Sequence, residues 1–179
     1  MDIKLTINNQ PVTAAPGKTI LEAARENGIN IPTLCYHKDL SPVGSCRLCM
    51  VEIEKWRGQA AACTTPISDG MVVHTETPTV IQTRHLVLEL LLQNYSDSGY
   101  ALGDRPQDNE FMHWVQHYQV SLPEAARPQA RFQVDSDPNP VVWVDFNKCI
   151  LCTRCVRACA EIQGRFVWGV GERGHDTQI

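Results

Sequence analysis

Eight cysteines are gathered in two short stretches of this 179-residue chain, and their type and spacing indicate chemistry. Four lie within residues 35–63 and four within residues 149–159, with none between the two stretches. The start of the chain lacks the basic, apolar and small-residue regions of an export signal, so the expected compartment is cytoplasmic, where thiols stay reduced. Two compact groups of reduced thiols predict metal binding rather than disulfides.

The first group has the spacing Cys35-x10-Cys46-x2-Cys49-x13-Cys63. Two irons and two sulfides need four thiolates in two pairs, and a Cys-x2-Cys turn can supply one close pair. One structural zinc ion also accepts four cysteines, but such sites usually carry two Cys-x2-Cys knuckles, and this group has one. The spacing therefore favours a [2Fe–2S] cluster and leaves structural zinc as the alternative.

Three residues beside these cysteines are candidate cofactor-binding residues, namely Gly44, Ser45 and Arg47. A loop at Gly44 and Ser45 can turn backbone N–H groups toward the negative charge of a cluster, and glycine has no Cβ to prevent close approach. A positive charge at Arg47 would raise a reduction potential; the alternative is a solvated surface arginine.

The second group, Cys149-x2-Cys152-x2-Cys155-x3-Cys159, has the spacing of bacterial ferredoxins and predicts a [4Fe–4S] cluster. In two-cluster ferredoxins the fourth cysteine of such a run ligates the other cluster. Cys149, Cys152 and Cys155 would then need a partner from elsewhere, and Cys159 would serve a second cluster. The alternative is that all four cysteines close one cluster.

The pattern around the first group predicts an α+β unit over residues 1–78. Thr19 and Glu22 have the spacing of a capping box, and Gly28 suits the position after a helix end. The predicted elements are strands at 3–7, 12–14, 50–54, 59–63 and 71–74 and a helix at 20–27. A ββα order followed by further strands is typical of a β-grasp fold, which is the fold expected here.

Two further regions follow. Residues 79–140 are predicted as a linking helix and a proline-rich linker, and residues 141–179 as a partial bacterial-ferredoxin-like domain, truncated at its end. The elements expected in these regions are helices from Pro78 to about Tyr95, at 111–120 and at 152–162, a loop at 96–110, and strands at 141–145 and 165–170.

Composition excludes several classes of protein. The formal net charge is −4, which argues against a nucleic-acid-binding surface. No run approaches eighteen apolar residues, so no membrane span is expected. No Ser/His/Asp or paired-carboxylate arrangement stands out, and no residue is predicted to be catalytic.

Three motifs of the first half resemble one known family: residues 31–36 (IPTLCY), 44–52 (GSCRLCMVE) and 61–66 (AACTTP). They are similar to the N-terminal [2Fe–2S] domain of the large subunit of NADH:quinone oxidoreductase, the iron-only and NAD-linked hydrogenases, and the alpha subunit of NAD-dependent molybdenum or tungsten formate dehydrogenase. Residues 147–159, 161–164 and 171–174 look most like the formate dehydrogenase subunit.

This resemblance implies an electron-transfer segment that relays electrons between a molybdopterin centre and a flavin/NAD site. Molybdopterin and FMN are expected elsewhere in a multi-subunit dehydrogenase, with a flavin/NAD-binding subunit as partner. The family continues with another cysteine run where this chain stops at Ile179, so a fragment is expected. The alternatives are an electron-carrying diaphorase or hydrogenase small subunit and, in another class, a zinc-stabilised interaction module.

The chain also departs from this family. Many relatives carry a His-x3-Cys-x2-Cys-x5-Cys cluster site after the long helix, but Tyr95 stands where the histidine would be and no cysteine follows before Cys149. We therefore expect that this site within 79–140 has been lost, which weakens an assignment to the quinone oxidoreductase.

Overall fold

The computed structural model describes residues 1–96, 109–132 and 145–179. Its contacts divide the chain into two compact units, Met1–Val87 and Leu88–Ile179. The division into regions at residues 78 and 140 stays a prediction.

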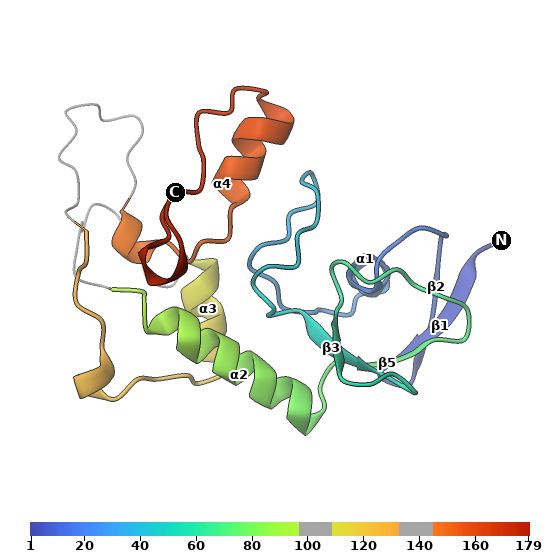
Figure 1. The fold of residues 1–179 in the computed structure, drawn as a ribbon. Helices are drawn as coiled ribbons and strands as arrows, with labels where there is room; N and C mark the ends of the chain where they lie inside the picture. Colours follow the sequence, from blue (N-terminus) through green and yellow to red (C-terminus); the bar gives the residue numbers. More distant parts are fainter. Residues whose placement is uncertain (97–108, 133–144) are drawn as a thin grey trace. The chain divides into compact units, whose positions relative to one another are not determined.

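The first unit is built on a mixed five-stranded sheet (Figure 1). Its strands are β1 (Ile3–Ile7), β2 (Gln10–Ala14), β3 (Met50–Ile53), β4 (Gln59–Ala61) and β5 (Val72–His74). The order across the sheet is β2-β1-β5-β3-β4, with β1 and β5 parallel and the other neighbours antiparallel. This α+β arrangement confirms the predicted fold class.

The core of this unit lies between the sheet and helix α1 (Ile20–Glu26). Alternate strand residues such as Leu5, Ile7, Val51 and Val73 are buried because successive side chains of a strand point to opposite faces. Helix α1 contributes its buried face to the same cluster.

The capping box predicted for α1 is confirmed. The Thr19 hydroxyl accepts from the Glu22 N–H, and the Glu22 carboxylate accepts from the Thr19 N–H at 2.8 Å. The start of the helix is also tied to a distant segment, since Leu21 N–H donates to the Ala62 carbonyl at 3.0 Å. The capping box therefore sets where α1 begins, and the Leu21 hydrogen bond holds that end against the residue before Cys63.

Helix α2 (Pro78–Leu92) begins at the predicted position, where the Val80 N–H donates to the Thr77 hydroxyl at 3.2 Å. Its buried positions include Val80, Arg84 and Leu88, which are four residues apart and so share one face. An arginine in the middle of a buried row was not expected from the sequence.

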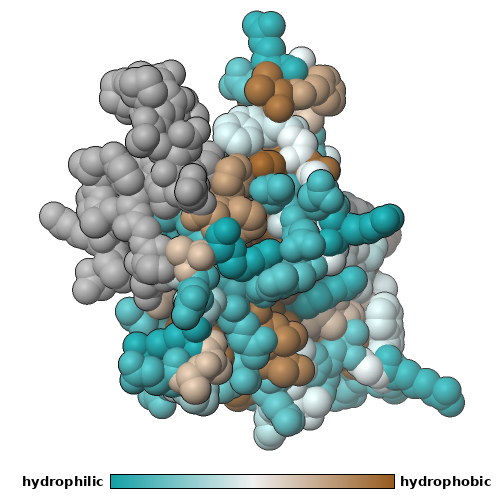
Figure 2. Space-filling view, turned by 60° about the vertical axis from the view of Figure 1, so that its left-hand side comes forward, coloured by the Kyte–Doolittle hydropathy of each residue, from teal (hydrophilic) through white to brown (hydrophobic). Residues whose placement is uncertain are grey.

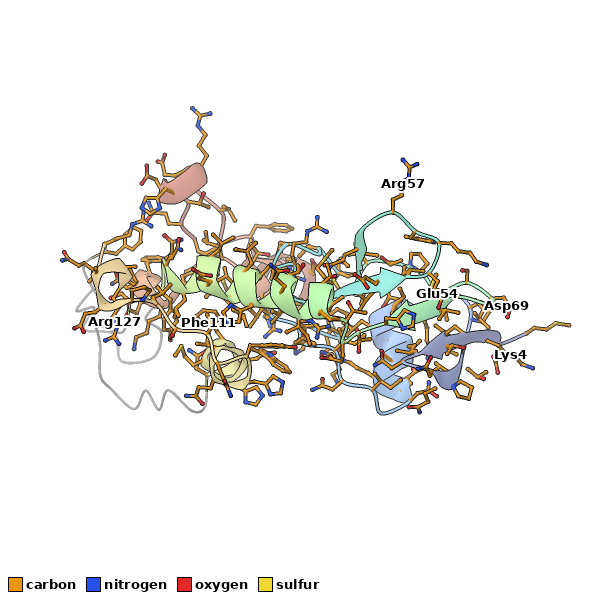
Figure 3. All side chains as sticks on the ribbon, turned by 90° about the horizontal axis from the view of Figure 1, so that it is seen from below. Lys4, Glu54, Arg57, Asp69, Phe111 and Arg127 are labelled. Atoms are coloured by element: carbon orange, nitrogen blue, oxygen red, sulfur yellow. The ribbon has the colours of Figure 1, made fainter. Side chains whose placement is uncertain are left out.

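The described part of the second unit has little regular structure besides two helices. Asn109 caps α3 (Glu110–His117) and also donates to the Tyr95 hydroxyl at 2.9 Å, while the Tyr95 and Phe111 rings lie 5.0 Å apart. Phe111 is labelled on this helix in Figure 3. Helix α4 (Arg154–Arg157) continues into a π-helix at Ala158–Ile162. Short 3-10 turns lie at Glu124–Ala126, Phe146–Lys148 and Gly174–Asp176.

The strand predicted at residues 165–170 is wrong. This segment has no strand pairing in the structure; Phe166 has a left-handed backbone (φ +53°), and Phe166 and Val167 are exposed. Its apolar composition suggested a strand, but its N–H groups turn toward Cys159 instead, with the Arg165 N–H donating to the Cys159 carbonyl at 3.0 Å. The strand expected at 141–145 and most of the loop at 96–110 fall outside the described residues.

The face seen in Figure 2 is mostly hydrophilic, with its hydrophobic residues in small separate groups. Among the described residues, no helix has the length and apolar character needed to cross a membrane.

Candidate metal centres

The first cysteine group is held by the loop between α1 and β3 and by the turn after β4. Ile31, Leu34 and Leu48 anchor this loop, each at 2% exposure or less. The Ala62 N–H donates to the Cys49 carbonyl at 3.0 Å, which brings the residue before Cys63 against the start of β3. Two segments distant in sequence are thereby fixed around one point.

The structure brings all four predicted thiols of this group together. Cys35, Cys49 and Cys63 are each 1% exposed and Cys46 is half-buried. Hydrogen bonds from the Cys46 and Cys63 thiols lower the pKa of Cys35, and a hydrogen bond from Cys63 lowers the pKa of Cys49 to about 7. Their roles as donors to Cys35, together with burial, raise the pKa of Cys46 and Cys63.

These thiol contacts are pairwise. Cys46 contacts Cys35, and Cys49 contacts Cys63, with one further contact between Cys35 and Cys63. At neither cysteine group, within residues 1–96, 109–132 and 145–179, are three Cys, His, Asp or Glu side chains arranged as ligands of one metal ion. Two pairs of thiols suit a centre with two irons, whereas structural zinc needs four thiolates around one ion.

The candidate residues beside these cysteines differ in what they contact. Gly44 is buried with φ +61°, and a Cβ built there would lie 3.2 Å from the Thr64 Cγ2. The Ser45 side chain hydrogen-bonds the Cys35 sulfur and helps to lower its pKa. Arg47 has a left-handed backbone (φ +56°) and an exposed side chain. Gly44 therefore allows the loop to approach the residue that follows Cys63.

Replacing Gly44 with alanine is expected to reduce the iron retained by the first group, because the new Cβ pushes Thr64 and with it Cys63 away. Gly58→Ala is the matched control, since Gly58 also has a positive φ (+76°) but nothing within 4 Å of its Cβ position. Both changes should lower the free energy of unfolding by about 1 kcal/mol through backbone strain. Iron analysis after gel filtration distinguishes the two variants, because only Gly44→Ala should lose iron. Equal iron content in Gly44→Ala and Gly58→Ala contradicts a role for the close approach of Gly44 to Thr64.

The four cysteines of the second group differ in exposure and surroundings. Cys149 and Cys152 are half-buried and Cys155 is exposed. Burial, with smaller contributions from nearby Cys152 and Cys155, raises the pKa of Cys149. The Leu151 N–H donates to the Cys149 sulfur at 3.4 Å, within a loop where Leu151 and Thr153 both have left-handed backbones. Such strained turns cluster at functional sites.

Cys159 is placed differently. It is buried in the π-helix, and backbone N–H groups of Trp168, Val167 and Phe166 lower its pKa. The Val167 N–H lies 3.3 Å from its sulfur. Successive N–H groups around one sulfur form an anion-binding nest. The π-helix turn closes with the Gln163 N–H donating to the Ala158 carbonyl at 3.1 Å, one residue before Cys159.

Asn147 is a positioning residue that the sequence did not single out. Its side-chain oxygen accepts from the backbone N–H groups of Arg131 (2.7 Å) and Phe132 (3.0 Å), and its amide donates to the Phe132 carbonyl at 2.9 Å. Its own carbonyl accepts from the Ser96 N–H at 2.9 Å. One buried side chain thus fixes the backbone two residues before Cys149. No local pattern could show this, since each partner but its neighbour Asp145 is at least fifteen residues away.

Two arginines lie among the cysteines of the second group. Arg157 is 8% exposed and donates to the Thr153 hydroxyl at 3.3 Å and the Cys152 carbonyl at 3.4 Å. Arg154 pairs with Glu110 at the start of α3 at 2.5 Å. Arg157 thereby holds the loop at Cys152 against α4, and Arg154 ties the start of α4, which carries Cys155, to α3.

Two family models match this chain at the two cysteine groups. Residues 1–78 match the 2Fe-2S iron-sulfur cluster binding domain, and residues 139–179 match the ferredoxin-like domain of NADH-quinone oxidoreductase subunit 3. These two domain types agree with the two predicted centres, a [2Fe–2S] cluster and a ferredoxin-type iron–sulfur centre.

Whole-chain comparisons agree. One subunit of the NADH-quinone oxidoreductase from Rhizobium meliloti (strain 1021) is 40% identical over 99% of this chain and 21% of that protein. The mitochondrial 78 kDa subunit of NADH-ubiquinone oxidoreductase from Candida albicans is 31% identical over 99% of this chain and 25% of its own length. The chain thus spans about a fifth to a quarter of these curated relatives.

Among solved structures, a chain of NAD+-reducing [NiFe]-hydrogenase in the H2-reduced state matches with a TM-score of 0.82 and 30% identity. The match covers 98% of this chain and 73% of the hydrogenase chain. The absence of cysteines between Cys63 and Cys149, which weakened the assignment to the quinone oxidoreductase, does not place the chain outside that group. The narrower resemblance to formate dehydrogenase stays a prediction. The chain belongs to the iron–sulfur family that contains this subunit of NADH-quinone oxidoreductase, the 78 kDa subunit of NADH-ubiquinone oxidoreductase and a chain of NAD+-reducing hydrogenase.

Proposed function

We propose that this chain is an electron-transfer segment of a multi-subunit oxidoreductase, with Cys35, Cys46, Cys49 and Cys63 as the ligands of a [2Fe–2S] cluster. The observation that carries the proposal is the pairwise contact of these four thiols in a folded β-grasp unit. Such a cluster supplies one-electron transfer when bound. The Ser45 side chain would offer a hydrogen bond to the Cys35 sulfur, and Gly44 lets the loop approach Thr64 closely.

The second group is proposed to serve two centres. Cys149, Cys152 and Cys155 would hold a [4Fe–4S] cluster with a ligand from outside this run. The nest around Cys159 would present its thiolate to a different cluster. The separate surroundings of Cys159 support this division over a single cluster closed by all four cysteines.

Measuring iron, acid-labile sulfide and zinc in the anaerobically purified protein tests the proposal, together with low-temperature EPR of the dithionite-reduced sample. We expect a brown protein that bleaches on reduction, with about two irons and two sulfides per chain from the first group and further iron from the second. A colourless protein with stoichiometric zinc would show a zinc-stabilised interaction module instead.

The finer proposal is that the whole enzyme is an NAD-linked formate dehydrogenase. It is supported by the resemblance of residues 147–159, 161–164 and 171–174 to that alpha subunit. Electrons would pass from a molybdopterin centre to a flavin/NAD-binding subunit. A second candidate is an electron-carrying subunit of a diaphorase or hydrogenase, which the likeness to the NAD+-reducing hydrogenase favours.

The native complex, isolated through this subunit, distinguishes the two. Formate-dependent NAD reduction with molybdenum or tungsten present supports the first candidate. Hydrogen-dependent NAD reduction with nickel present supports the second and contradicts the first.

A further inference from the structure

Arg84 is the largest fully buried side chain in the described part of the chain. It lies on α2, and its guanidinium is 0% exposed. A guanidinium keeps its charge under all ordinary conditions, so the first unit contains a permanent positive charge out of contact with water. Removing a charge from water is costly, and the group must be held by specific partners.

Those partners place the charge beside the first cysteine group. Arg84 Nη2 donates to the Met50 carbonyl at 3.2 Å, and Nη1 pairs with Glu76 Oε1 at 2.9 Å. Met50 follows Cys49 directly, and the Cys49 carbonyl in turn accepts from the residue before Cys63. The guanidinium therefore contacts the backbone one residue from the point where two of the four thiols meet.

The charges of this ion pair are unequally screened. The Glu76 side chain is 54% exposed, whereas Arg84 has no contact with solvent. Water and salt weaken the field of an exposed carboxylate much more than that of a buried cation. The pair therefore leaves a net positive field inside the unit.

We propose that Arg84 tunes and positions the first metal centre: its buried charge favours the reduced form and so raises the reduction potential. This inference rests on the proposed function, because it needs a [2Fe–2S] cluster at Cys35, Cys46, Cys49 and Cys63. Reduction adds one electron and therefore one negative charge, with no bond formed or broken in the protein. A cation nearby stabilises that added charge, and its hydrogen bond to the Met50 carbonyl holds the end of the cysteine loop.

The test compares two variants that break the same ion pair but change the charge in opposite directions. Arg84→Gln is expected to lower the equilibrium constant for one-electron reduction about tenfold, which corresponds to about 59 mV. That size is expected for a unit charge roughly 10 Å away at an effective dielectric constant of about 20. Glu76→Gln should raise the same constant by roughly threefold at low salt and by less at high salt.

Arg57→Gln is the matched control. It removes the same charge from the exposed turn between β3 and β4, where the labelled side chain points away from the sheet in Figure 3. Its potential should equal that of the parent protein. Arg84→Lys, which keeps a positive charge but loses the two-sided contact, should stay closer to the parent than Arg84→Gln does.

EPR-monitored redox titration of the purified protein measures all four variants, with circular dichroism as a check of folding. Opposite shifts for Arg84→Gln and Glu76→Gln support the proposal. Potentials that shift in the same direction in both variants show that loosening of the ion pair, and not its charge, is responsible. Unchanged potentials in both variants show that Arg84 does not tune the centre. Either result overturns the proposal. If Arg84→Gln does not fold, a raised potential in Glu76→Gln together with a potential near that of the parent in Arg84→Lys supports the proposal, and an unchanged or lowered potential in Glu76→Gln overturns it. A parent protein without any reducible [2Fe–2S] signal refutes the proposed function itself, which is a distinct outcome.

Discussion

Cys49→Ser is expected to abolish the [2Fe–2S] EPR signal and to remove about two irons and two sulfides per chain. Cys49 is 1% exposed, contacts Cys63 and lies in the hydrophobic core, so no neighbouring group can replace its sulfur. A serine hydroxyl gives up its proton far less readily than a thiol does. Loss of the cluster should also lower the melting temperature of the first unit, because metal binding by buried thiols is coupled to folding.

Cys155→Ser is the control for this prediction. Cys155 is the exposed cysteine of the second group, so its replacement should leave the [2Fe–2S] signal intact while changing the remaining iron content. If Cys49→Ser retains the full [2Fe–2S] signal, Cys49 is not a ligand and the proposed ligand set is wrong.

The second large effect concerns the division of the second group. In the native complex, Cys152→Ala is expected to eliminate the [4Fe–4S] cluster at Cys149, because two thiols of the loop do not hold a cubane. Cys159→Ala should leave that cluster in place and instead remove a different one. The reason is that the Cys159 sulfur faces the backbone N–H groups of residues 166–168, which the other three cysteines do not share in the contacts described.

Mössbauer spectroscopy of the iron-57-enriched complex counts the clusters lost in each variant. Loss of the same single cluster in both variants would show that Cys149, Cys152, Cys155 and Cys159 close one cubane. Ala160 is next to Cys159 and carries no side-chain donor, so Ala160→Ser is a suitable control for a small change at this position.

The two predictions depend on different kinds of information. The four ligands of the first centre could be proposed from spacing, because a Cys-x2-Cys turn and a capped helix are local features. The capping box of Thr19 and Glu22 is confirmed for the same reason: its hydrogen bonds span three residues and need no distant partner. The strands from Ile3 to His74 were also found, since alternation of apolar residues marks a sheet with one buried face.

The second half of the chain was less predictable. The apolar run at 165–170 suggested a strand, yet it has no neighbouring strand to pair with in the described residues and instead surrounds Cys159. Periodicity reports which residues prefer burial, but it does not report whether a partner strand is present.

By itself, the sequence determined the two cluster types, the four sulfur ligands expected for the first centre and the α+β class of the unit that holds them. Only the tertiary structure decided that backbone N–H groups of residues 166–168 surround the Cys159 sulfur, that Asn147 holds the backbone before Cys149, and that Arg84 is buried against Met50. The physical reason is the sequence separation between the residues that make each feature. Turn geometry and thiol spacing act over a few residues. The Arg131 and Phe132 partners of Asn147 and the Met50 partner of Arg84 are 15 to 34 residues away, and the Val167 N–H at Cys159 is eight residues away, beyond the reach of any local pattern.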